Sequence, residues 1–486
     1  MTIRRSSSPL SLFEAILPIV AMLVLFLAGA ALLGVSPELL IAVLLGAATV
    51  AGVVAARHGI TWDDVQRSTG EKLASVLPAL LILLSIGMLI ATWVLGGTIP
   101  YLVYWGIELV SPRYLILTAF IATAMMSLFT GTSWGSAGTI GVALMGTAAA
   151  LNAPLAATAG AVVSGAYLGD KLSPLSDSTN ICAIAAGTPL YTHIRHMLYT
   201  ALPSTVAALV VYALAARLTP LSSTGPPDGA RELLVDLGAV FRLNPIVLVP
   251  PAIVIWSIVR KVPPALAIAL SSLAAALVGI LVQGFTVQDA IGSAVAGFRL
   301  DMVGSTGADP GTLGGAFVTL VERGGLYSMA NTLVVVISAF LLAGAMDASG
   351  ALDLLVSRML RAVRSTFGLI SATMLSGGTM IALTSHGGVT ALVIGGLFQG
   401  AYEERGLAPQ NLSRSLEDSV TITEPLMPWT VSAVFMATTL GVPTLEYAPW
   451  AVFCYGGTLF SLLIARFFRR TGFGIKLIGP GAAPIP

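Results

Sequence analysis

The sequence predicts an all-α protein that crosses a membrane many times, and three observations support this fold class. Of its 486 residues, 56% are hydrophobic and only 10% are charged, whereas soluble domains carry about a quarter of charged residues. Apolar runs near the roughly 20 residues that a helix needs to span a bilayer recur along most of the chain. The net charge of +1 and the widely separated Cys182 and Cys454 give no sign of a nucleic-acid partner or of a disulfide framework. We therefore predict roughly 11–14 transmembrane segments, including broken or re-entrant helices, and no cofactor.

The first apolar run, 15–35, is too long for a signal peptide and leads directly into a second run at 38–56. We expect an uncleaved transmembrane helix with Arg4 and Arg5 on the cytoplasmic side. The runs at 136–150 and 388–400 are short and rich in glycine, so we expect half-helices or re-entrant pieces there. The other apolar spans are expected at about 73–95, 114–130, 154–169, 197–216, 245–259, 263–282, 328–346, 367–384, 426–440 and 447–466.

Polar stretches divide the chain into five parts. The stretch 219–242 is rich in proline, glycine and charge, which is typical of a linker. Three arginines (Arg358, Arg361 and Arg364, the arginine triplet) alternate with apolar residues and predict an amphipathic helix on the cytoplasmic face, or else a solvated loop. The expected parts are N-terminal helices in 1–72, a first repeat in 73–218, a linker with connecting helices in 219–327, a second repeat in 328–470 and a tail in 471–486.

The two repeats are predicted from three short matches that occur in the same order. Small residues are abundant in membrane helices, so each match alone is weak. The matches are Ser85…Gly96-Gly97 with Ser338…Ser349-Gly350, Thr132-Ser133-Trp134-Gly135 with Thr384-Ser385-His386-Gly387, and Leu172-Ser173…Asp177-Ser178 with Leu412-Ser413…Asp418-Ser419.

Flanking charge indicates that the two copies run in opposite senses. The opening run of the first copy, 73–95, follows Arg57, Arg67 and Lys72 and should enter from the cytoplasm. The opening run of the second copy, 328–346, precedes the arginine triplet and should end at the cytoplasm. Inverted repeats with broken helices at matching positions are typical of a secondary transporter with a binding site at the bilayer midplane.

The polar stretch 169–180 is the candidate ion site of the first copy. An ionised aspartate at bilayer depth costs about 2.5–3.5 kcal/mol, so it persists where it lines a cavity or binds a cation. Pro174 breaks the helix and frees carbonyl oxygens near the acidic and hydroxyl side chains. A polar surface loop is the alternative, but the matching stretch 412–425 in the second copy favours a site. The expected ligands are Asp177, Asp418, Ser133, Ser178, Thr179, Asn180, Ser385 and Thr421, with Asp170, Glu424, Thr132 and His386 as secondary candidates.

The stretch Gly131-Thr132-Ser133-Trp134-Gly135 matches the G-x-S-x-G pattern of a hydrolase nucleophile elbow. An elbow needs a strand before the serine, whereas an apolar helical span precedes Ser133 here. An intramembrane serine protease using Ser133 and His386 remains a distant alternative, and we predict that the protein is not an enzyme. His193 and His196 have metal-like spacing, but we expect them in a cytoplasmic or interfacial loop.

Four segments of the chain resemble the NhaC family of Na⁺/H⁺ antiporters: 87–106, 131–141, 169–180 and 412–429. The resemblance runs from about residue 10 to residue 465 and implies a Na⁺/H⁺ antiporter that works by alternating access, with Na⁺ at Asp177 and Asp418. Similar family members exchange organic acids such as malate and lactate, or carry amino acids, so a Na⁺- or H⁺-coupled transporter of a small organic acid or amino acid is the alternative. The implied setting is a prokaryotic inner membrane with both termini cytoplasmic. The implied partners are membrane lipid, Na⁺ and protons, and a homo-oligomer is left open.

Overall fold

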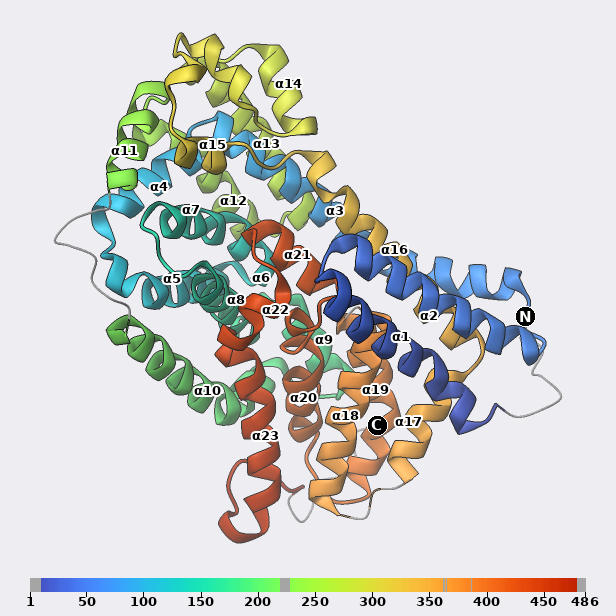
Figure 1. The fold of residues 1–486 in the computed structure, drawn as a ribbon. Helices are drawn as coiled ribbons and strands as arrows, with labels where there is room; N and C mark the ends of the chain where they lie inside the picture. The colour runs from blue at the N-terminus through green and yellow to red at the C-terminus, as the bar shows by residue number, and fades with distance from the viewer. Residues whose placement is uncertain (1–9, 219–227, 362, 364, 386, 479–486) are drawn as a thin grey trace.

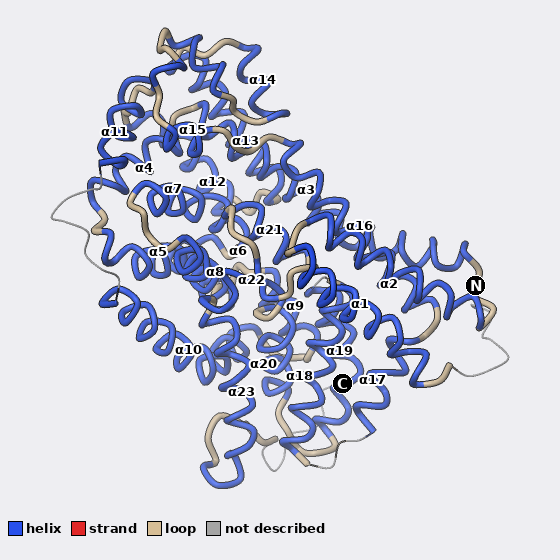
Figure 2. Tube along the Cα trace, in the orientation of Figure 1, coloured by secondary structure: helices blue, strands red, loops and turns tan. Residues whose placement is uncertain are grey.

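The chain is helical throughout in its computed structural model, which describes residues 10–218, 228–361, 363, 365–385 and 387–478. Within these residues, the only extended pairing is an isolated antiparallel bridge between Leu407 and Leu477 (Figure 2). The predicted all-α class is therefore confirmed. Arg4, Arg5, Arg364 and His386 lie outside the described residues.

Three N-terminal helices pack along the edge of the molecule (Figure 1). The third is much longer than the predicted span 73–95, because Thr61 and Asp64 form a capping box that starts the helix in the polar stretch before it. The N-terminal helices are α1 (Leu12–Leu33), α2 (Pro37–Arg57) and α3 (Trp62–Leu95).

The next group of helices contains the first candidate ligands. The predicted half-helix at 136–150 belongs to one continuous helical stretch, in which a π-helical turn at Ala137–Gly141 joins a four-residue helix to a nine-residue helix. The helices are α4 (Thr98–Leu109), α5 (Leu115–Thr130, extended at its start by a 3₁₀ turn, Pro112–Tyr114), α6 (Ser133–Ser136), α7 (Val142–Ala150), α8 (Leu155–Leu172), α9 (Asp177–Ala185) and α10 (Leu190–Leu218).

The middle of the chain forms a separate group of helices at one end of the molecule (Figure 1). Part of the predicted linker 219–242 is helical, since residues 228–240 form α11. Phe241, Phe285, Phe298 and Phe317 pack together with ring centroids 5.5–6.3 Å apart. The helices are α11 (Asp228–Val240), α12 (Val249–Val259), α13 (Pro264–Val278), α14 (Val287–Ala296) and α15 (Gly315–Val321).

The last third of the chain carries the second set of candidate ligands. The arginine triplet starts in a helix as predicted, because Arg358 and Arg361 belong to α17. The helices are α16 (Ala330–Ala348), α17 (Ala351–Arg361), α18 (Thr366–Thr384), α19 (Gly387–Glu403), α20 (Pro409–Leu416), α21 (Val431–Leu440), α22 (Thr444–Tyr447) and α23 (Val452–Thr471).

Eight helices in the described part of the chain are long and apolar enough to cross a membrane, and two bent helix pairs raise the number to ten. The sequence predicted roughly 11–14 segments by counting every apolar run. Several of those runs form helices that are too short to span a bilayer alone, such as α7 with nine residues and α21 with ten. Short helices of this kind lie among the longer ones (Figure 1), and α7 and α9 carry the buried Thr147 and Thr179.

Candidate ion-binding site

The first helix break lies between α8 and α9. Helix α8 ends at Leu172, and α9 begins at Asp177 after an extended turn that contains Pro174. The Ser176 hydroxyl caps α9 by accepting a hydrogen bond from the Thr179 backbone N–H, at 3.3 Å. Proline cannot donate a backbone hydrogen bond, and the cap starts a new helix, so the local sequence accounts for the break.

The second helix break follows α20. The chain continues from α20 into a π-helical segment, Glu417–Thr421, and a 3₁₀ turn, Glu424–Leu426. Helix α21 then begins, and the Thr430 hydroxyl caps it by accepting from the Ala433 N–H at 3.3 Å. Single π turns within helices are frequent at functional sites. This one carries two carboxylates, Glu417 and Asp418, both buried.

An ion pair inside the molecule joins the two breaks. The Lys171 ammonium at the end of α8 donates to Oδ1 of Asp418, and both side chains are fully buried. Thr200 on α10 donates to the same oxygen at 3.2 Å, and Oδ2 has no hydrogen-bond partner among the described residues. The sequence reasoning did not single out Lys171, although a lysine within an apolar segment is a signal, since a buried ammonium needs a partner.

Glu417 lies beside a histidine of α10. Thr421 donates to Glu417 Oε1 at 2.7 Å, and His193 Nε2 lies 3.8 Å from Oε2. The other ring nitrogen of His193 is 2.8 Å from the Ser413 hydroxyl. The prediction that His193 and His196 lie in a loop is therefore wrong, because both are buried in α10. In the part of the chain that the structure describes, no three acidic, histidine or cysteine side chains form a metal-binding group.

Asp170 is surrounded by hydroxyl groups. The carboxyl group is buried, and the hydroxyls of Ser176 and Ser133 lie within hydrogen-bonding range of it. The carboxylates of Glu417 and Asp177 are close enough to act on its charge. Among the described residues, no lysine, arginine or histidine forms an ion pair with Asp170.

Glu424 lies in a different environment. The Gly387 N–H at the start of α19, and both the N–H and the hydroxyl of Ser432, lie within hydrogen-bonding range of its buried carboxyl group. Ser432 also contacts the Tyr167 hydroxyl at 2.7 Å and accepts from the Trp134 indole N–H at 3.0 Å. Trp134 stacks on Phe435 with ring centroids 4.6 Å apart.

The other ligands expected in the predicted first repeat have structural roles near the first helix break. Asp177 is exposed in the first turn of α9. Ser178 contacts the Ser176 hydroxyl at 3.0 Å, and Thr179 donates to the carbonyl oxygens of Asp170 and Lys171, both at 3.2 Å. The remaining two bind backbone groups: Asn180 donates to the carbonyl oxygens of Pro174 and Ser176, and Thr132 caps α6 by accepting from the Gly135 N–H.

In the predicted second repeat, Ser385 ends α18 in the left-handed backbone conformation, with a φ of 56°. Its buried hydroxyl has no hydrogen-bond partner among the described residues. Thr421 holds Glu417, as described above. The structure brings Asp418 to Lys171 and gives no contact between Asp418 and Asp177 in the described residues, so their joint Na⁺ site stays a prediction.

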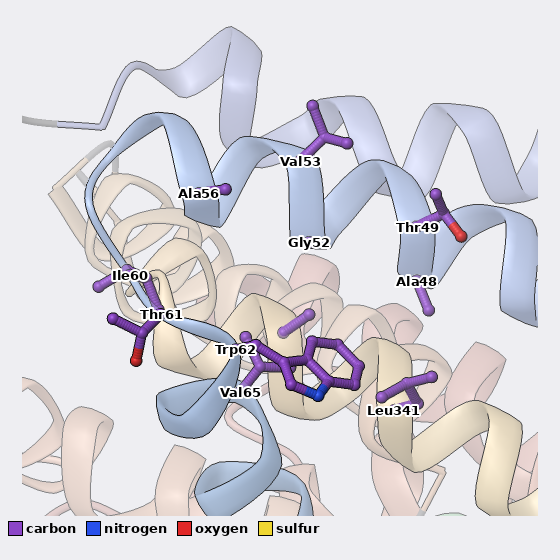
Figure 3. A pocket seen from close by; sticks show the side chains of 11 residues that line it. Ala48, Thr49, Gly52, Val53, Ala56, Ile60, Thr61, Trp62, Val65 and Leu341 are labelled. Atoms are coloured by element: carbon purple, nitrogen blue, oxygen red, sulfur yellow. The ribbon is translucent and has the colours of Figure 1, made fainter.

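Two other features lie outside this cluster. Ser133 follows helix α5 rather than a strand, so in the described residues it lacks the local structure of a nucleophile elbow. A crevice of about 330 Å³ between α2, α3 and α16 has mostly apolar walls, including Val53, Trp62 and Leu341 (Figure 3). It contains none of the predicted ion ligands.

Buried carboxylates at two helix breaks, inside a protein whose helices cross a membrane repeatedly, define an ion-coupled membrane transporter. A model of the Na⁺/H⁺ antiporter family matches residues 165–467. The chain belongs to this family of secondary transporters, and the resemblance seen in the sequence is confirmed.

Several relatives cover nearly the whole chain. An uncharacterized Na⁺/H⁺ antiporter of Haemophilus influenzae is 44% identical over 98% of both chains. The Na⁺/H⁺ antiporter NhaC of Alkalihalophilus pseudofirmus is 33% identical over 86% of this chain and 87% of its own. A malate-2H⁺/Na⁺-lactate antiporter of Bacillus subtilis is 31% identical over 90% of this chain and 91% of its own.

Proposed function

We propose that the protein exchanges Na⁺ for H⁺ across a prokaryotic inner membrane by alternating access, with the cation held at Asp170. The observation that carries this proposal is a buried carboxyl group among hydroxyls with no ion-pair partner in the described residues. Isolated ionised carboxylates are too costly to bury, so such a group is neutral or binds a cation. Hydroxyl and carboxylate oxygens are hard ligands that suit a hard cation such as Na⁺.

The neighbouring groups then have defined tasks. Ser133 and Ser176 supply hydroxyl oxygens beside Asp170, and exposed Asp177 attracts cations to the access route. The carboxylate of Asp418 is already neutralised by Lys171, so it does not need the transported ion as a partner. Motion of one half of the molecule against the other would open the site to each side in turn. Cytoplasmic termini and a homo-oligomer remain predictions.

A second candidate is the coupled exchange of a small organic acid, and one residue favours it. The fully buried Arg414 donates from Nη1 to the Gly474 carbonyl oxygen, while Nε and Nη2 have no partner among the described residues. A guanidinium group binds carboxylates through two parallel hydrogen bonds. A small dicarboxylate or hydroxy acid would suit the unpaired nitrogens.

The first prediction concerns transport in proteoliposomes, with internal pH followed after an external Na⁺ pulse. We expect Asp170→Asn to abolish the Na⁺-driven pH change, because the amide removes the buried negative charge. Asp177→Asn is the matched control and should weaken the apparent Na⁺ affinity less than about tenfold, since an exposed charge is screened by solvent.

If Asp177→Asn abolished the pH change and Asp170→Asn did not, the sodium site would instead lie at Asp177 and Asp418, as the sequence alone suggested. Adding malate or lactate tests the second candidate in the same vesicles. A pH change that requires the organic acid, and that is lost in Arg414→Lys, would replace sodium–proton exchange by organic-acid exchange.

A further inference from the structure

Helix boundaries in two parts of the chain recur at one constant spacing. The helical segments Pro112–Thr130 and Thr366–Thr384 have 19 residues each and lie 254 positions apart. The next helix starts are spaced by the same 254 positions: Ser133 and Gly387, Leu155 and Pro409, Asp177 and Val431, and Leu190 and Thr444. The short sequence matches had suggested spacings of 240 to 253, so the structural spacing corrects them.

Turns and hydrogen bonds follow the same spacing. Left-handed backbone conformations occur at Gly131 and Ser385, at Asn152 and Gly406, and at Gly187 and Gly441. The hydroxyls of Thr130 and Ser136 are 3.2 Å apart, and those of Thr384 and Thr390, 254 positions later, are 2.6 Å apart. The caps at Ser176 and Thr430 correspond as well. We infer that residues 112–218 and 366–471 are two copies of one structural unit.

This spacing pairs Asp170 with Glu424. Each carboxyl group is buried at a helix break and is followed at the same distances by a leucine and a proline: Leu172 and Pro174 in one copy, Leu426 and Pro428 in the other. Asp170 lies beside Ser133, and Glu424 lies beside Gly387, which is the counterpart of Ser133. The two carboxyl groups therefore occupy equivalent positions in the two copies.

The surroundings of Asp170 and Glu424 differ, and the difference suits the two carboxyl groups to different roles. Hydroxyl oxygens beside Asp170 can bind a cation directly. Two of the groups beside Glu424 are backbone N–H donors, of Gly387 and Ser432, which stabilise a carboxylate but cannot bind a cation. Glu424 is thus suited to lose and regain a proton, rather than to hold sodium.

The two carboxyl groups are also linked. Tyr167 lies within electrostatic reach of both Glu424 and Asp170. The single turn of α6 supplies Ser133 to Asp170 and, through its next residue, Trp134 to the Ser432 hydroxyl beside Glu424. Among the described residues, Tyr447 is a further titratable group near Glu424, and its hydroxyl donates to the Pro425 carbonyl at 2.6 Å.

We propose that the proton exchanged for sodium resides on Glu424, while Asp170 holds the cation; this rests on the function proposed above. Both carboxyl groups are buried and lie within electrostatic reach of Tyr167, and burial disfavours negative charge in this region, so Glu424 is protonated while no sodium is bound. Sodium at Asp170 brings a positive charge to this buried region, the O–H bond of Glu424 breaks, and its proton leaves to water while the N–H donors stabilise the carboxylate. By reciprocity, a proton on Glu424 weakens sodium binding at Asp170.

Equilibrium binding of radioactive sodium to purified protein, from about pH 6 to about pH 9, tests this division. Release of about one proton per bound sodium makes the wild-type affinity fall about tenfold per unit of falling pH. In Glu424→Gln, which mimics the protonated side chain, sodium should bind weakly, and its affinity should fall much less than tenfold per unit of falling pH. Asp170→Asn should not bind sodium. Glu446→Gln, an exposed glutamate of α22, is the control and should behave as wild type.

A retained tenfold slope in Glu424→Gln overturns the inference and leaves the proposed function intact. Complete loss of binding in a folded Glu424→Gln also overturns it, because Glu424 would then be a cation ligand. Absence of sodium binding in the wild type contradicts the proposed function itself. If Glu424→Gln does not fold, Glu424→Asp takes its place: a shifted pH range with the same slope supports the inference, and an unchanged range contradicts it.

Discussion

The two helix breaks have the same framework but different chemistry. In the first, Asp170 is followed by Lys171, and in the second, Glu424 is followed by Pro425. Lys171 reaches Asp418 in the other copy and forms a fully buried ion pair. Proline carries no charge, and among the described residues no ion pair equivalent to that of Lys171 forms at the second break. The comparison indicates that the repeated unit fixes where a carboxyl group lies, whereas its neighbours decide what that group does.

The largest expected effect concerns this ion pair. Lys171→Ala leaves the buried Asp418 carboxylate uncompensated and should lower the free energy of unfolding by about 3–5 kcal/mol. At the equivalent position, Pro425→Ala should cost only about 0.4–1 kcal/mol, mainly through the unfolded chain. Thermal unfolding in detergent measures both, and the double variant Lys171→Met with Asp418→Leu should regain most of the stability. An equal loss of unfolding free energy in Lys171→Ala and in Pro425→Ala would contradict this difference between the two breaks.

An intermediate effect should separate two adjacent residues of α6. Ser133→Ala removes a hydroxyl beside Asp170 and should weaken sodium binding by about 1.5–3 kcal/mol without changing its pH slope. Trp134→Phe leaves an aromatic ring to pack on Phe435 but removes the N–H that donates to Ser432. Ser432 then stabilises the Glu424 carboxylate less well, so sodium affinity should begin to fall at a higher pH. Identical sodium-binding profiles for the two variants would disprove this separation.

The smallest expected effect compares the two helix caps. Ser176→Ala and Thr430→Ala should each lower the free energy of unfolding by about 1 kcal/mol, because each removes the acceptor for a helix N-terminus. Only Ser176→Ala should also weaken sodium binding, since the Ser176 hydroxyl lies beside Asp170. Isothermal titration measures the sodium affinity of both variants. A weaker sodium affinity in Thr430→Ala as well would show that the two caps have the same role.

Much of the fold followed from local sequence. Long apolar runs predicted the membrane class, and Pro174 with its neighbouring polar residues predicted the first break. The correspondence between residues of the two copies could not be predicted from the sequence, because the matching residues are chemically different: Lys171 corresponds to Pro425, and Asp177 to Val431. The ion pair of Lys171 with Asp418 joins residues 247 positions apart, and no local pattern encodes such a contact. The predicted ligands Asp170 and Glu424 were ranked second because an exposed aspartate and a buried one look alike in sequence.

Arg414 has a consequence for how the protein is made. Its guanidinium group is fully buried on α20 and donates to the carbonyl oxygen of Gly474, which lies 60 positions later in the chain. Asn411 is joined to Lys476 in the same way, by two hydrogen bonds of 2.6 and 3.0 Å. A ribosome adds about 5–20 residues per second, so several seconds pass before these partners exist. During that interval the Arg414 guanidinium on α20 lacks this partner. The helix α20 therefore reaches its final position in the membrane only after the segment 472–478 has been synthesised.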